Sequence, residues 1–183
     1  IWKGVFRNFF KDIEIRTIFV WVTLLAALMA FALAGSYFTT TGAVLRRGLF
    51  EVLSGSFNLG FSTLQGGQIL FAMGSGALFV IILSMTICGS SSSASGGIKA
   101  LRIGIIARSV VQAVRKALAP DRALPRTFFF QKGRHRLTPE LVSAAMIIFL
   151  LYMVTYAAGA IAGIAYGYEA LPAIFDSVSA ASN

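Results

Sequence analysis

Two stretches of the chain share a pattern of residues that is suited to holding a cation with backbone oxygens. Residues 50–58 and 175–183 both fit Phe, acid, any residue, branched aliphatic, Ser, three small or apolar residues, Asn. The second copy stops at Asn183, so we expect the sequence to be part of a longer protein with repeated units. Glycine permits dihedrals that a side chain forbids, so the first copy could aim carbonyl oxygens at a dehydrated cation. The candidate donors are Asn58, Leu59, Gly60 and Phe61.

Each copy also carries an acidic residue near its start, Glu51 in the first and Asp176 in the second. We expect both to lie near the outer, N-terminal ends of short helices that lead into the loops. Carboxylates stabilise that end of a helix, and here they could concentrate cations at the mouth of a pore. The C-terminal end of the same short helix is partly negative and would favour a cation at the loop.

The composition indicates a membrane protein. Hydrophobic residues make up 57% of the chain and charged residues 13%, whereas a soluble domain carries about 25% charged residues. The net charge is +9, but the basic residues cluster before residue 17 and between Lys99 and Arg136, apart from Arg46 and Arg47. This distribution follows the positive-inside rule and argues against a nucleic-acid surface. The predicted location is the plasma membrane, crossed several times.

The uncharged segments predict how the chain crosses the bilayer. Residues 17–38 would span it as a first helix. Residues 52–98 carry no charge, and one helix of that length would reach roughly 70 Å, so the run must fold back. We expect a re-entrant half-helix over 48–57, a return loop over 58–64 and a second spanning helix over 67–87.

A stretch rich in serine and glycine interrupts the second helix. Residues 88–97 are poor helix formers, yet no charge appears before Lys99, so the break lies at membrane depth or near the inner interface. A plain surface loop is the alternative for this stretch, as a packing or turn glycine is for Gly60. Lys99 itself would either act on the loop or extend to the cytoplasm. The candidate loop residues are Gly89, Ser90, Ser91, Ser92, Ser93, Ala94, Ser95, Gly96 and Gly97.

The remaining segments complete an all-α membrane fold of helix–pore loop–helix repeats with re-entrant half-helices, similar to a potassium channel. A basic helix is expected over 98–119, a third spanning helix over 141–168 and a second half-helix over 170–182. The predicted divisions are a cytoplasmic interfacial segment (1–16), a complete unit with a broken second helix (17–119), a cytoplasmic basic linker (120–137), and the first helix and pore helix of the next unit (138–183).

Other functions fit the residues less well. A phosphate-binding loop requires Lys directly after Gly, but Ile98 separates Gly97 from Lys99. An enzyme would need an acid, histidine or metal site within a spanning helix, and the sequence offers none, so we expect neither catalysis nor a cofactor. A membrane scaffold without transport would explain the helices but not two matching half-helix motifs.

The two motifs together resemble the Trk/Ktr/HKT family of potassium transporters. The first is Phe-acid-x-x-Ser-x-x-x-Asn-Leu-Gly-Phe-Ser-Thr, and the second is the Gly/Ser-rich stretch that ends in Gly-Gly-Ile-Lys. The resemblance implies four helix–pore–helix units in one chain, of which this sequence would be the third and the start of the fourth. It implies that Asn58, Leu59, Gly60 and Phe61 bind potassium through their carbonyls, that Asn183 begins the fourth filter loop, and that residues 89–97 form a gate.

The resemblance also implies partners and leaves selectivity open. The family forms homodimers, and many members bind a cytosolic nucleotide-sensing ring, for which the basic region 99–136 is the expected contact. Transport of sodium, or of both ions, by the same fold remains an alternative. The chain departs from the family in a gate loop that is unusually rich in serine, and in the positive charges of Arg46 and Arg47 near a cation entrance.

Overall fold

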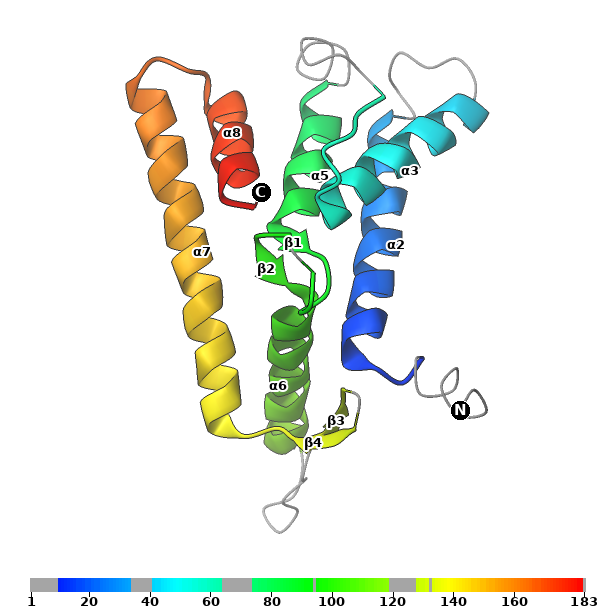
Figure 1. Ribbon diagram of the computed structural model, residues 1–183, viewed down its shortest axis with the longest axis vertical. Helices are drawn as coiled ribbons and strands as arrows, with labels where there is room; N and C mark the ends of the chain where they lie inside the picture. Colours follow the sequence, from blue (N-terminus) through cyan, green and yellow to red (C-terminus); the bar gives the residue numbers. More distant parts are fainter. Residues whose placement is uncertain are drawn as a thin grey trace.

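The computed structural model describes residues 10–33, 41–63, 74–93, 95–118, 128–131 and 133–182. The chain is mainly helical, as the sequence predicts (Figure 1). Its helices are α2 (Ile13–Leu33), α3 (Thr41–Phe57), α5 (Gly74–Thr86), α6 (Ala100–Leu118), α7 (Pro139–Ala165) and α8 (Ala170–Ser182). Its short strands are β1 (Ile87–Cys88), β2 (Ile98–Lys99), β3 (Phe128–Phe130) and β4 (Arg134–Arg136).

Helices α2 and α7 are long and apolar enough to cross a membrane. With 21 and 27 residues they measure about 32 Å and about 41 Å, against a hydrocarbon core of about 30 Å. In each helix, only 11% of the most apolar 18-residue stretch is buried within the protein. The core helix of a soluble protein would be mostly buried, so these exposed apolar faces are suited to lipid.

Helix α7 begins and α8 runs as the sequence predicts. Thr138 is the N-cap of α7, since its hydroxyl accepts a hydrogen bond from the Leu141 N–H at 3.4 Å, and Pro139 follows it. Helix α8 covers the predicted range 170–182 and packs mainly against α7. It descends from the upper end of α7 and stops near the middle of the molecule (Figure 1).

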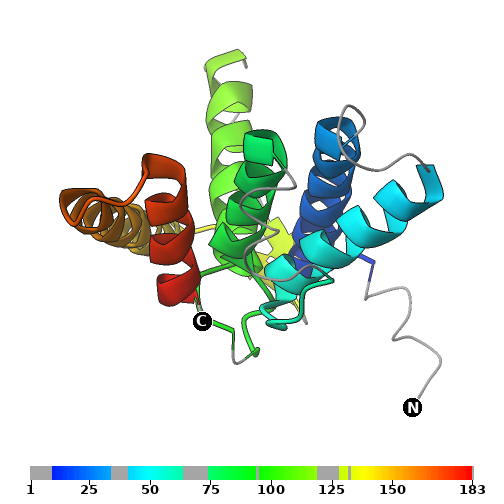
Figure 2. The same ribbon diagram turned by 90° about the horizontal axis from the view of Figure 1, so that it is seen from above.

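Helix α3 is longer than the predicted half-helix over 48–57, because it begins at Thr41. Arg46 and Arg47, which precede the predicted half-helix, lie within α3. The helix runs obliquely from the periphery toward the centre, so its 17 residues end near the middle of the molecule (Figure 1). Seen from above, α3 and α8 lie on opposite sides of α5 (Figure 2).

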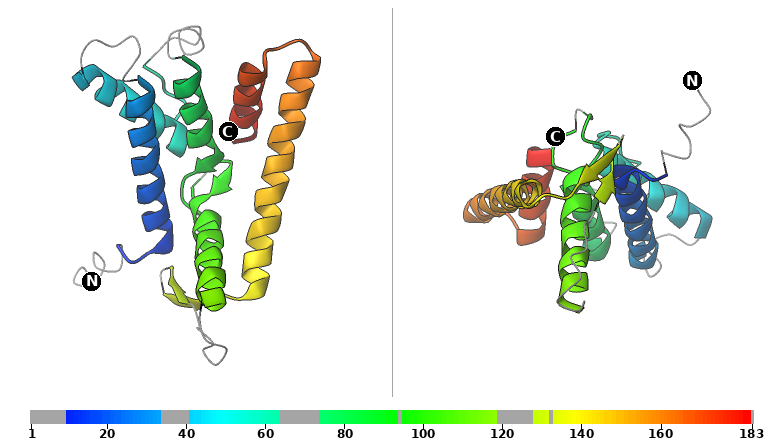
Figure 3. Two further views of the ribbon diagram at one scale, coloured as in Figure 1. Left: turned by 180° about the vertical axis from the view of Figure 1, so that it is seen from behind. Right: turned by 90° about the horizontal axis from the view of Figure 1, so that it is seen from below.

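The second helix of the unit is broken, as predicted, but the break is closed by a pair of strands. Helix α5 ends at Thr86, and α6 continues below it after the loop (Figures 1 and 3). Strands β1 and β2 pair in parallel, with Ile87 opposite Ile98 and Cys88 opposite Lys99. The prediction of a helix from residue 98 is therefore wrong by two residues, because residues 98 and 99 pair as a strand instead.

The segment predicted as a basic linker contains a hairpin that the all-α expectation missed. Strands β3 and β4 are antiparallel, with Phe129 opposite His135. The Arg108 guanidinium on α6 donates to the Phe128 carbonyl at 2.7 Å, and Phe129 is buried. The hairpin is thus fixed beside the lower end of α6 (Figure 3).

Two hydrophobic clusters hold the helices together. One joins α2, α3 and α5 around Leu25, Met29 and Val52, all fully buried. The other joins α5, β2, α7 and α8 around Ile82, Ile98, Tyr156 and Val178, among others. Helix α5 contributes to both clusters and therefore ties the first half of the chain to the second. The expectations for residues 1–9, 64–73, 119–127, Ala94 and Asn183 lie outside the described residues.

Candidate functional site

Helix α3 stops at the predicted loop because Asn58 adopts a left-handed backbone conformation, with φ of +54°. The Leu59 N–H donates to the Ser54 carbonyl at 3.0 Å and the Asn58 N–H to the Gly55 carbonyl at 3.2 Å. This pair of bonds is a Schellman motif, with asparagine in the position that glycine usually holds. The motif ends the helix and turns the chain back on itself.

The segment over 58–63, which we call the return loop, follows with an irregular backbone. Gly60 has φ of +72°, in the left-handed region that favours glycine. A Cβ at this position would meet no other described atom within 4 Å, so the backbone conformation, not crowding, explains the glycine. Asn58 and Gly60 are both left-handed, so the return loop is not a simple extended run.

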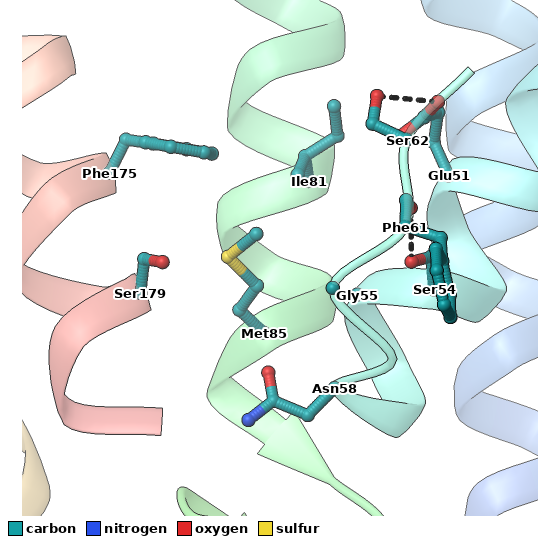
Figure 4. A pocket seen from close by; sticks show the side chains of 11 residues that line it. Glu51, Ser54, Gly55, Asn58, Phe61, Ser62, Ile81, Met85, Phe175 and Ser179 are labelled. Carbon is teal, nitrogen blue, oxygen red and sulfur yellow. Dashed lines mark hydrogen bonds between the residues drawn. The ribbon is translucent and has the colours of Figure 1, made fainter. Parts of the chain in front are cut away.

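Ser54, which is buried, binds the return loop from α3. Its hydroxyl donates to the Phe61 carbonyl (Figure 4). That carbonyl was predicted to face a cation, but it is directed at α3, because a hydroxyl lies within hydrogen-bonding reach one helix turn before Asn58. A carbonyl oxygen has two lone pairs, so one acceptor position of Phe61 is engaged within the protein.

Glu51 is the main anchor of the return loop and is only 5% exposed. Its Oε1 atom accepts hydrogen bonds from the Thr63 N–H and hydroxyl, both at 2.7 Å, and from the Ser62 hydroxyl at 3.1 Å (Figure 4). The prediction that Glu51 lies near the N-terminal end of its helix is therefore wrong, whereas its role at a pore mouth stays a prediction. Helix α3 starts ten residues earlier, and the carboxylate is used to hold backbone and hydroxyl groups of its own loop.

Asp176, the counterpart of Glu51 in the second copy, has a different environment. It is exposed and lies in the middle of α8, not near its N-terminal end. The predicted dipole interaction at a helix start is thus wrong for Asp176 as well, since charge–dipole effects are confined to the first turn. Asp176 and Glu51 therefore occupy matching positions in the sequence repeat but have different structural environments.

A cavity of about 240 Å³ lies between α3, the return loop, α5 and α8. Ile81 and Met85 of α5 and Phe175 and Ser179 of α8 face the return loop across it (Figure 4). The cavity thus brings the two sequence copies together, one on each side. The residues of the first copy that line it are Glu51, Ser54, Gly55, Asn58, Gly60, Phe61 and Ser62.

The C-terminal ends of α3 and α8 meet beside this cavity. The Asn58 side chain, through its Nδ2 atom, donates to the carbonyl of Ser182, the last residue of α8. The C-terminal end of a helix carries a partial negative charge from its aligned peptide dipoles, equivalent to about half an elementary charge. Two such ends directed at one region create an environment that favours a cation.

The segment over 89–97, which we call the serine loop, is attached directly below α3. The Gly89 N–H donates to the Ser56 carbonyl at 3.1 Å, near the C-terminal end of α3. Gly89 and Gly97 both have positive φ, +46° and +70°, so glycine is required at both ends of the loop. The β1–β2 pair holds these ends together. The loop is therefore a closed structure between two helices and not a plain linker.

Lys99 acts on the serine loop, which was one of the two predicted alternatives. Its ammonium group donates to the Ser93 carbonyl at 2.8 Å and to the Ser95 carbonyl. Glu14, at the start of α2, holds the same loop from another side, where it accepts hydrogen bonds from the Ser91 N–H and hydroxyl. The sequence offered no signal for the Glu14 contact, because 77 residues separate the two partners.

Comparisons with known proteins show where this arrangement of helices has been seen before. No established protein-family model matches the chain. The chain has the fold of part of the potassium transporter TrkH from Vibrio parahaemolyticus, with a TM-score of 0.73 and 23% sequence identity over 93% of this chain and 35% of that chain. It is also 30% identical over 135 residues to an uncharacterized cation transporter of Methanocaldococcus jannaschii. That alignment covers 74% of this chain and 27% of the relative.

The fold implied by the predicted resemblance is thereby confirmed, since the chain has the fold of part of the potassium transporter TrkH. The chain spans about a third of the solved relative and about a quarter of the curated one. Together with the long, apolar and exposed helices α2 and α7, these similarities indicate a membrane protein.

Proposed function

We propose that this chain contributes one complete pore unit and half of a second to a protein that transports potassium across the plasma membrane. The observation that carries the proposal is the glycine-dependent return loop at the end of a half-length helix, facing α8 across a cavity, in a chain with the fold of a potassium transporter. The relative from Methanocaldococcus jannaschii, named as a cation transporter, supports transport independently.

In this proposal α3 and α8 are re-entrant half-helices that end at the middle of the bilayer. The carbonyls of Asn58, Leu59 and Gly60, with the remaining lone pair of the Phe61 carbonyl, replace part of the water around a dehydrated potassium ion. Asn183 begins the corresponding loop of the next unit. Four such loops complete the ring, and the other units supply the rest. Glu51 and Ser54 fix the return loop in position.

The serine loop is the proposed gate of this pore. Support comes from its bond to the end of α3 through Gly89 and from its glycine hinges at positions 89 and 97. In the closed state the loop obstructs the path of an ion that leaves the return loop, and its displacement opens that path. The protein acts as a homodimer, and the basic helix α6, with exposed Val110, Val114 and Leu118, is the proposed contact for a cytosolic regulatory ring.

Rubidium uptake into proteoliposomes that contain the full-length protein tests the filter. Alanine at Gly60 would carry a left-handed penalty of about 1–2 kcal/mol, which corresponds to roughly a tenfold loss of the competent conformation. We expect a comparable loss of rubidium uptake in Gly60→Ala. Gly74→Ala is a matched control, because Gly74 has the same φ of +72° and equally open surroundings but lies outside the cavity.

Equal uptake by the two variants would contradict the filter assignment. Sodium uptake, measured in parallel, separates the alternatives: sodium flux equal to rubidium flux would indicate a mixed pore, and the absence of any cation flux would indicate a scaffold.

A further inference from the structure

The serine loop is held by a small number of polar contacts. Ser91, Ser92 and Ser93 are exposed, so apolar packing contributes little to the position of this part of the loop. Lys99 holds the loop from within, through the carbonyls of Ser93 and Ser95. A loop that depends on so few bonds changes position when one of them is released.

The contact with Glu14 is the bond that ties the exposed tip of the loop to another helix. Both oxygens of the carboxylate are used: Oε1 accepts from the Ser91 N–H, and Oε2 accepts from the Ser91 hydroxyl at 3.2 Å. Hydrogen bonds to an ionised carboxylate are roughly twice as strong as neutral ones. This two-point contact fixes the orientation of residue 91 as well as its distance from α2.

Glu14 is itself held at the beginning of α2. Its N–H donates to Asp12 Oδ1 at 2.9 Å, and the Arg16 N–H donates to the Asp12 carbonyl at 3.1 Å, so Asp12 forms the start of the helix. The carboxylate therefore projects from a helix end of defined geometry. A displacement of this end of α2 would be transmitted to the serine loop.

We propose that Glu14 is the positioning residue that holds the serine loop in its closed arrangement, so that release of the Glu14–Ser91 contact favours opening. This inference rests on the proposed function, because it assigns the regulation of the same gate. It links the gate to the end of α2 that follows the basic N-terminal segment, where the chain can respond to a membrane surface or to a partner.

The test uses the full-length protein in proteoliposomes with two readouts. The first is rubidium uptake, and the second is the rate at which a water-soluble thiol reagent modifies Ser92→Cys in a Cys88→Ser background, Cys88 being the only cysteine in this chain. The variants are Glu14→Gln, which keeps one acceptor without the charge, Glu14→Ala and Ser91→Ala. Glu140→Gln is the control, because Glu140 also lies in the first turn of a helix, but of α7 and not of α2.

We expect Glu14→Gln to raise both uptake and the modification rate by about threefold, as for loss of a partly exposed charged hydrogen bond. Glu14→Ala should raise both further, Ser91→Ala should have a smaller effect because its N–H remains, and the control should match the wild type. A purely structural role would lower uptake instead. Reduced or unchanged uptake with an unchanged modification rate in the Glu14 variants would overturn the inference.

The two proposals fail in different ways. If the wild type takes up rubidium and the Glu14 variants leave both uptake and the modification rate unchanged, only the proposal that Glu14 holds the serine loop is contradicted. If neither the wild type nor any variant takes up rubidium, the transport proposal is contradicted, and the modification rate still decides whether Glu14 holds the loop.

Discussion

At the scale of single residues, the return loop depends on an acidic side chain that binds the loop itself. Glu51 is buried on α3 and accepts three hydrogen bonds from Ser62 and Thr63. A buried carboxylate is tolerated only when such donors replace its water. The carboxylate thus fixes the end of the loop while Asn58 fixes its beginning, and Gly60 is held between two anchors.

We expect Glu51→Gln to weaken the hydrogen bonds that hold the end of the return loop, although glutamine has nearly the same shape as glutamate. The amide keeps one oxygen acceptor but loses the charge, and it introduces donors where three donors already converge. Loss of charged hydrogen bonds of this kind costs about 1.5–3 kcal/mol. Thermal unfolding of the purified full-length protein should therefore occur at a lower temperature, and rubidium uptake should fall.

Glu169→Gln is the control for this substitution, because Glu169 is exposed in the connection between α7 and α8. Equal stability and uptake in the two variants would show that the Glu51 bonds do not hold the loop.

The importance of Gly60 could be predicted from the sequence, whereas the anchors could not. Gly60 follows a repeated motif, and the need for glycine is a local property of the backbone, here a φ of +72°. The partners of Glu51 lie 11 and 12 residues further along the chain, and the partner of Glu14 lies 77 residues away. A single sequence contains no signal for such pairs, so Glu51 was assigned to the pore mouth and Glu14 was given no role.

At the scale of helices, α8 is fixed by close contact with α7. Gly159 of α7 faces Ser177 of α8, and the Ser177 hydroxyl donates to the Tyr156 carbonyl at 2.8 Å. A Cβ at Gly159 would clash with the Ser177 hydroxyl and lie 3.0 Å from its Cβ. Glycine therefore allows the two helices to approach, and this approach sets the position of the α8 end beside the cavity.

Gly159→Ala should separate α7 from α8 and destabilise the protein. Overpacking costs about 1–3 kcal/mol, and the better helix propensity of alanine returns about 1 kcal/mol, so a net loss of about 1 kcal/mol is expected. Thermal unfolding and rubidium uptake measure the effect. The double variant Gly159→Ala with Ser177→Gly restores the space and should recover much of the uptake.

Gly42→Ala serves as the control, since a Cβ at Gly42 meets nothing within 4 Å. If the double variant is no better than Gly159→Ala alone, helix separation is not the cause of the loss.

The ends of the helices could be predicted best where capping residues mark them. Thr138, Pro139 and Glu140 marked the start of α7, and α8 was predicted over its observed range. Helix α3 was predicted too short, since it was expected over 48–57 and begins at Thr41, so that Arg46 and Arg47 lie within it. Strand pairs of two or three residues, such as β1–β2, depend on contacts between distant segments and leave too short a pattern to detect.

At the scale of the whole molecule, basic residues gather at one end of the helix bundle and exposed tyrosines lie at the other. The start of α2, the end of α6 and the start of α7 lie at the same end (Figures 1 and 3). The basic residues at these positions include Lys11, Arg16, Arg115, Lys116 and Arg136. The opposite end carries the exposed aromatic residues Tyr166 and Tyr168, which are typical of a membrane interface. The molecule therefore has one orientation that satisfies the positive-inside rule.

This orientation predicts which positions are reached from outside the cell. In a Cys88→Ser background, Glu169→Cys follows the upper end of α7, and Lys116→Cys lies in the last turn of α6 at the basic end. A thiol reagent that does not cross membranes should label Glu169→Cys in intact cells, but Lys116→Cys only after permeabilisation. Labelling of both from outside would mean that α7 does not cross the bilayer. Labelling of Lys116→Cys alone in intact cells would mean that the protein has the opposite orientation in the membrane.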